Sequence, residues 1–148
     1  MLDRNAVGRK SPPTLHEVEK GAIRRFAESI GDLSPLYFDA EQARAAGYQN
    51  VPAPPSFAFS FTNGADVREL LGVPVRGLLL ADLSWEFERT MVAGDRIMVS
   101  SRIAEVGERP GPTGPLEVAV LEDEGRDVDG RLVYRGRRTY VFRPTRDV

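Results

Sequence analysis

The second half of the chain alternates apolar and polar residues with a period of two, and this pattern restricts it to half-buried β-strands. A turn at Gly94-Asp95, a Pro/Gly loop at residues 110–115 and a tight Asp129-Gly130 turn separate the alternating segments. The sequence therefore predicts four antiparallel strands in a meander, with a β-bulge where the period breaks near Gly136. The strands are expected over residues 83–87, 97–104, 116–125 and 131–142.

The first half of the chain has the pattern of helices and loops. Apolar residues within 18–30 fall on one helical face, and Gly31 is well placed to end that helix. Asp39 begins a capping box that opens a shorter helix, which Gly47 ends. Three prolines within residues 51–55 remove backbone donors and force extended geometry, so this segment is expected to be a stiff loop.

The segment 56–61, Ser-Phe-Ala-Phe-Ser-Phe, supports two predictions. Its alternation is that of a strand with three aromatic side chains on one face. Pro55, directly before it, suits the N-terminus of a helix, and a buried central helix can be apolar all round. We favour the helix. The aromatic side chains expected in the core are those of Phe57, Phe59, Phe61 and Trp85.

Size and composition are those of one globular domain. A chain of 148 residues fits a single domain, residues 1–148, with no apolar run near the ~20 residues of a membrane span. Its N-terminus lacks the apolar core of a secretory signal, which predicts a cytoplasmic protein. The chain has no cysteine and one histidine, His16, so we expect no metal site and a noncatalytic His16. A net charge of -2 argues against nucleic acid as the main ligand.

Five stretches of the first half carry a resemblance to a known family. They are Phe26-Ala27, Gly31-Asp32, residues 35–39, residues 43–48 and residues 51–57. With the order of helices and strands given above, they resemble the MaoC-like dehydratases, and among these the N-terminal-type, accessory members. The likeness extends from Val7 to Phe142. It implies an α+β fold, a single hot-dog domain in which an antiparallel sheet wraps around a central apolar helix, and it implies no cofactor.

The resemblance implies chemistry on acyl thioesters. Members of this family hydrate trans-2-enoyl thioesters, or dehydrate 3-hydroxyacyl thioesters, carried on coenzyme A or acyl carrier protein. An Asp and a His flank one water, because the reaction needs a base for the water and an acid for the α-carbon. Asp32 matches that Asp, whereas Tyr37 stands at the His and Ser34 at an Asn of the family's loop. A phenol titrates at about 10, so Tyr37 is a poor base at neutral pH.

A second departure concerns the thioester oxygen. Active members carry His-Gly before the central helix, and the Gly amide helps to hold this oxygen as enolate charge builds up. This chain has Pro54-Pro55 there, and proline has no amide hydrogen. The Ser56 N–H substitutes only if the alignment shifts by one residue. The candidate substrate-binding residues implied by the resemblance are Ser34, Pro55, Ser56 and Phe57.

The missing His and the missing amide donor predict a partner chain. In the family, acyl channels form where two hot-dog units pair, so the resemblance implies a dimer. We expect a heterodimer in which this chain shapes the acyl tunnel and a catalytic MaoC-like subunit supplies Asp and His. One alternative is a homodimeric enoyl-CoA hydratase, or another thioester enzyme, that uses Asp32. Another is a non-enzymatic acyl-thioester-binding or scaffolding protein.

The loop residues also have structural interpretations. Asp32 can bond backbone amides beyond the end of the helix, as loop aspartates often do. Tyr37 either packs as a buried loop aromatic, which we favour, or points its hydroxyl at Asp32. Under these structural interpretations, neither Asp32 nor Tyr37 needs a catalytic role.

A cluster of arginines near the end of the chain also supports two interpretations. One is an anion site for a coenzyme A phosphate. The other, which we favour, is pairing with glutamates brought across by the Asp129-Gly130 hairpin. The residues concerned are Arg135, Arg137 and Arg138 on one strand, and Glu122 and Glu124 on the other.

Overall fold

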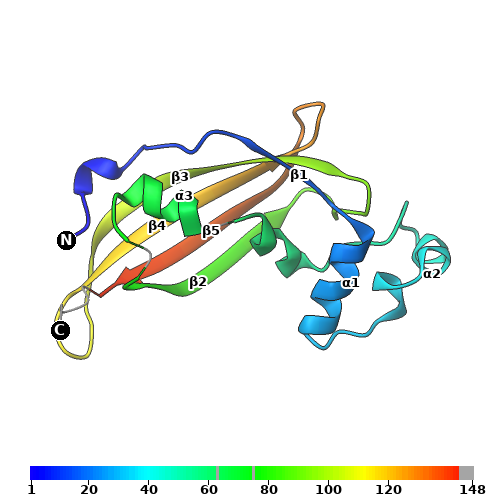
Figure 1. Cartoon of the computed structure of the whole chain (residues 1–148), viewed down its shortest axis with the longest axis horizontal. Helices are drawn as coiled ribbons and strands as arrows, with labels where there is room; N and C mark the ends of the chain where they lie inside the picture. Colours follow the sequence, from blue (N-terminus) through cyan, green and yellow to red (C-terminus); the bar gives the residue numbers. More distant parts are fainter. Residues whose placement is uncertain (63, 75, 144–148) are drawn as a thin grey trace.

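A computed structural model describes residues 1–62, 64–74 and 76–143, and all statements on structure concern these residues. The chain forms one five-stranded antiparallel sheet, in the order β1-β3-β4-β5-β2, with its helices on one face and at one end (Figure 1). The strands are β1 (Thr14–Glu17), β2 (Leu78–Phe87), β3 (Arg96–Arg109), β4 (Leu116–Arg126) and β5 (Leu132–Phe142). The helices are η1 (Arg4–Ala6), α1 (Lys20–Ser29), η2 (Pro35–Tyr37), α2 (Ala40–Ala45), η3 (Pro55–Phe61) and α3 (Gly64–Leu71), where η marks 3-10 helices.

The predicted meander is only partly right. Strands β3, β4 and β5 follow one another as expected, but β2 pairs with β5 rather than with β3. The link from β2 to β3 therefore crosses the sheet instead of forming a hairpin, although Gly94 does make the predicted turn, with φ of 94°. This link pairs with the Pro-rich loop. The Ala53 N–H donates to the Met91 carbonyl and the Ala93 N–H to the Val51 carbonyl, both at 2.8 Å.

The sequence did not predict β1, which pairs with β3 at the sheet edge. Three of its four residues are exposed, so the apolar alternation that marks a half-buried strand is absent. Its position also places His16 opposite Ile97.

Both predicted N-terminal helices are present. Ile23 and Ala27, one turn apart, are the buried residues of α1, and Gly31 follows the helix in the left-handed region with φ of 72°. The Asp39 side chain accepts hydrogen bonds from the Glu41 and Gln42 amides and caps α2.

The helix predicted over residues 56–61 is present as η3, and the strand alternative for these residues is wrong. The sequence did not predict α3. Figure 1 shows α3 over the sheet, and α1 and α2 beyond one end of it. The helical backbone breaks the alternation of a strand, so the three phenylalanines do not share one face: Phe57 and Phe61 enter the core while Phe59 stays 37% exposed. The prediction that Phe59 is a core residue is therefore wrong. Among the described residues, none of the helices is long and apolar enough to cross a membrane.

The helix-covered face of the sheet carries two apolar clusters with a polar group between them. The first cluster gathers around η3, the second around α3 and η1. Between them, Arg138 holds Asp123 with two hydrogen bonds, of 2.8 Å from Nε and 2.7 Å from Nη2. Ser101 completes the group, because its hydroxyl donates to Asp123 at 2.5 Å and accepts from Arg138 at 3.0 Å.

The bulge predicted near Gly136 is also wrong. The irregularities of the sheet lie at 80–82, 103–105 and 125–126. Gly136 pairs regularly with Trp85, and its lack of a side chain leaves room for the indole, since a Cβ there would lie 3.0 Å from the Trp85 ring. Gly125 makes room for Tyr134 in the same way, because a Cβ would lie 2.2 Å from its ring.

Candidate functional site

The loop that follows α1 holds Asp32 in a tight turn. The Asp32 amide donates to the Ala27 carbonyl at 3.0 Å, so the loop leaves the helix from its last turn. The Asp32 carboxylate accepts the Ser34 N–H at 3.2 Å, which is the structural use of a loop aspartate. The Asp32 side chain is otherwise exposed to solvent.

Tyr37 lies in η2 and packs, half-buried, against the first apolar cluster. Burial raises the pKa of its phenol above the ordinary value, and the nearby Asp32 carboxylate and Tyr48 phenol raise it further. At neutral pH the Tyr37 hydroxyl is therefore protonated and available as a hydrogen-bond donor, not as a base. Packing, the interpretation favoured from the sequence, describes this side chain.

The N-terminus of η3 presents the other candidate residues. Pro55 occupies the first helical position, is exposed and has no N–H. The Ser56 N–H forms no hydrogen bond within the described part of the chain, so it is the first amide donor at this end. Phe57 is 3% exposed and meets Phe26 edge-on, with ring centroids 5.5 Å apart.

The structure brings some of these residues together and leaves others apart. Tyr37 and Phe57 both belong to the apolar cluster around η3. No hydrogen bond among the described residues joins Asp32 or Ser34 to η3. The sequence did not single out Tyr48, whose phenol acts on Tyr37. The sequence signal that could have pointed to Tyr48 is its position directly after Gly47, which ends α2.

His16, which the sequence set apart, lies against the same helix. Its ring stacks on Phe61 with centroids 4.7 Å apart and planes 21° apart. The single histidine of the chain is thus a neighbour of η3, although β1 carries it.

The arginine cluster divides between the two faces of the sheet. Arg135 and Arg137 pair across the hairpin with Glu124 at 3.8 Å and Glu122 at 3.2 Å, as predicted. Arg138 does not join them, because consecutive strand residues point to opposite faces. It is buried on the core face with Asp123 instead.

Comparison with known proteins identifies the family. The model of the FAS1-like dehydratase domain region matches residues 5–135. The chain belongs to this family. It is 38% identical over 147 residues to a UPF0336 protein of Streptomyces griseus, across 96% of this chain and 95% of the relative.

Solved structures share the fold. The C-terminally truncated HadBC complex of Mycobacterium tuberculosis, a (3R)-hydroxyacyl-ACP dehydratase, superposes with a TM-score of 0.79 at 24% identity, over 92% of this chain and 96% of that one. A MaoC-like dehydratase superposes with a TM-score of 0.80 at 24% identity, over 93% of this chain and 42% of that one. The predicted α+β hot-dog fold of the MaoC-like dehydratases is therefore confirmed for this member of the FAS1-like dehydratase family.

Proposed function

We propose that this chain is the acyl-thioester-binding subunit of a 3-hydroxyacyl-thioester dehydratase or enoyl-thioester hydratase. It pairs with a catalytic hot-dog chain that supplies the Asp and the His. The observation that carries the proposal is Tyr37. It stands where the resemblance requires a base, yet its phenol is half-buried with a raised pKa.

The second missing element is the amide donor for the thioester oxygen. Pro55 opens η3 and cannot donate, and each such catalytic element contributes about 10² to 10⁴ in rate. Without this base and this donor, the chain keeps a binding role. Ser34, Ser56 and Phe57 are the residues that serve it.

The open edge of the sheet supports pairing with another chain. Strand β2 is ten residues long and pairs on one side with β5, while its outer edge has no partner among the described strands. Leu79 and Leu80 on this strand are 54% and 38% exposed. A long apolar edge is a hazard for aggregation unless another chain covers it. The HadBC dehydratase, which shares this fold, is itself a complex.

Size-exclusion chromatography tests the pairing. The candidate partner is a chain encoded next to this one that carries Gly-Asp-x-Asn-Pro-Leu-His. Co-expressed with it, this chain should elute as a stable pair at twice the size of one subunit. Separate elution of the two chains at micromolar concentration would argue against the proposal.

A homodimeric enoyl-CoA hydratase that uses Asp32 is the second candidate. The exposed Asp32 carboxylate and the Ser56 N–H, which has no partner among the described residues, favour it, because both groups remain available to a substrate. A third, an acyl-thioester-binding or scaffolding protein without a catalytic partner, predicts thioester binding and no activity with any MaoC-like chain.

A further inference from the structure

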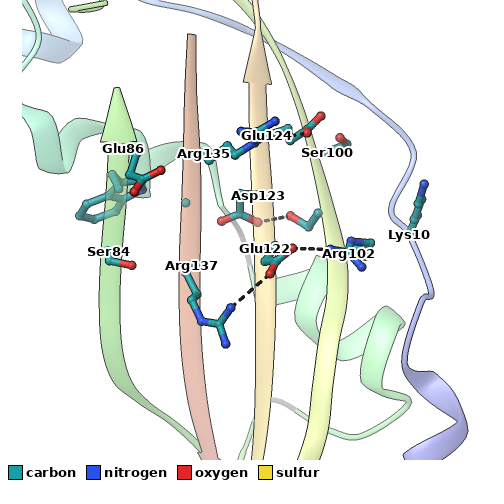
Figure 2. Close-up of a pocket in the computed structure, with 13 residues that line it drawn as sticks. Lys10, Ser84, Glu86, Ser100, Arg102, Glu122, Asp123, Glu124, Arg135 and Arg137 are labelled. Atoms are coloured by element: carbon teal, nitrogen blue, oxygen red, sulfur yellow. Dashed lines mark hydrogen bonds and ion pairs between the residues drawn. The ribbon is translucent and has the colours of Figure 1, made fainter. Parts of the chain in front are cut away.

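The face of the sheet that the helices leave uncovered is hollowed. A hollow of about 620 Å³ extends over β2, β5, β4 and β3 as far as the N-terminal segment at Lys10 (Figure 2). This volume lies within the range of small-molecule sites, roughly 300–1,000 Å³. The residues used above for thioester binding do not line it.

Charged side chains cross this hollow in two rows that follow the strand register. The first row, residues Glu86, Arg135, Glu124 and Ser100, contains two carboxylates for one arginine. The second row, one side-chain step further along the strands, contains Ser84, Arg137, Glu122, Arg102 and Lys10. Three cations thus share the second row with a single carboxylate, on a chain whose net charge is -2.

Glu122 alone serves both arginines of the second row. Arg102 reaches it from β3, and Arg137 reaches it from β5 at 3.2 Å, as Figure 2 shows. Each guanidinium carries five N–H donors and spends one hydrogen bond on Glu122, so most of its donors remain free. Lys10 forms no ion pair within the described part of the chain. The row therefore has more positive charge and more donors than its own carboxylate uses.

The geometry points to a phosphate-bearing anion as the ligand of this row, and we propose that Arg102, Arg137 and Lys10 bind it. Strands β3 and β5 lie two strand spacings apart, about 9.5 Å, so long side chains from both converge on an anion above β4. Planar guanidinium forks match the paired oxygens of a phosphate, and two adjacent phosphates suit two forks. The site lies on the opposite face of the sheet from η3, so it goes beyond the proposed function.

Titration of the full-length chain with inorganic pyrophosphate tests the proposal. We expect saturable shifts of backbone amide NMR signals at Ser84, Arg102, Glu122 and Arg137, at ionic strength held constant with sodium chloride. Arg102→Gln or Arg137→Gln should each weaken binding about tenfold, because each removes a charge-assisted contact. Glu122→Gln should strengthen binding, because it removes the carboxylate that competes with the anion.

Arg109→Gln is the matched control. Arg109 lies on the same strand as Arg102, is 52% exposed against 47%, and pairs with Glu105 outside the hollow, so its loss should leave the affinity unchanged. Shifts that fail to saturate, equal weakening by Arg109→Gln, or weaker binding after Glu122→Gln would each overturn the proposal. A parallel titration with ADP separates two sources of the phosphates. If ADP binds more tightly than pyrophosphate, the ligand of the site is a nucleotide. If the two bind equally, the site recognises the phosphates alone.

Discussion

Asp123 and Arg138 are the charged side chains that the described core buries, each at 1% exposure. Two hydrogen bonds join them, and Ser101 and Tyr140 take further donors of the guanidinium. A charge moved into the core costs several kcal/mol unless it is paired, so each member of the pair depends on the other. We therefore expect the loss of either member to destabilise the middle of the sheet.

Asp123→Asn should destabilise the fold by about 3–5 kcal/mol, because it leaves the Arg138 charge buried without a counter-charge. Urea unfolding, followed by circular dichroism, measures the loss. Glu122→Gln, one residue away on the exposed face, should cost less than about 1 kcal/mol. Equal losses for the two variants would show that the buried pair has no special weight.

Tyr134→Phe should leave stability unchanged or raise it, because the Tyr134 hydroxyl is buried without a hydrogen-bond partner among the described residues. Burial raises the pKa of Tyr134, and the Asp123 carboxylate raises it further, against the opposing effect of Arg138. The folded state therefore keeps the phenol protonated, whereas the unfolded chain ionises it above about pH 10. Above that pH the free energy of unfolding falls, because ionisation favours the unfolded state. Unfolding measured from pH 8 to pH 11 should show a shallower alkaline decline for the variant. A loss above about 1 kcal/mol at pH 7 would reveal a partner for the hydroxyl.

The double variant Ser34→Asn with Tyr37→His should recover only weak hydration of an enoyl thioester. It restores the loop pattern Gly-Asp-x-Asn-Pro-Leu-His, but Pro55 still withholds the amide donor. Steady-state kinetics with crotonyl-coenzyme A measure the recovery. A rate equal to that of an active family member would show that the donor at residue 55 carries little of the catalysis.

The alternation of side chains between the two faces of a strand explains which predictions about single residues were right and which were wrong. The pairing of Arg137 with Glu122 followed from the hairpin register alone. Arg138, next to Arg137, had to point the opposite way, yet no local pattern marks a buried arginine. The bulge at Gly136 was wrongly predicted for a related reason. Gly136 pairs with Trp85, which lies 51 residues away in sequence, and no local pattern reveals that contact.

At the scale of elements, predictions succeeded where the determinants are local. The Asp39 cap, the Gly31 stop and the Asp129-Gly130 hairpin depend on neighbouring residues, and all three are present. The order of the strands depends on contacts distant in sequence. The pairing of β2 with β5 could not be predicted from period alone, and α3 was missed altogether.

Leu79→Lys should weaken association with a partner chain and leave the folded monomer intact. Leu79 lies on the open edge of β2 at 54% exposure, where a lysine disfavours strand addition. Sedimentation of the co-expressed pair measures the dissociation constant. Val128→Lys, at 65% exposure near the turn of the hairpin, is the control and should have no effect. Equal effects of the two variants would place the partner elsewhere.

The whole molecule combines a family fold with a loop that departs from the family's pattern. Its sheet, helices and family membership are those of the FAS1-like dehydratases, while Tyr37 and Pro55 occupy the positions where the resemblance requires a base and an amide donor. A hot-dog unit of this kind presents an open strand edge and an apolar cluster beneath η3. We propose that this chain binds the acyl thioester and that a partner chain carries the catalytic groups.

The hydration of crotonyl-coenzyme A by this chain, alone and paired with a catalytic MaoC-like subunit, tests that account most directly. We predict no rate above the uncatalysed reaction for the chain alone and turnover by the pair, with Asp32→Asn in this subunit leaving the rate of the pair unchanged. Robust turnover by the isolated chain that Asp32→Asn abolishes would contradict the account.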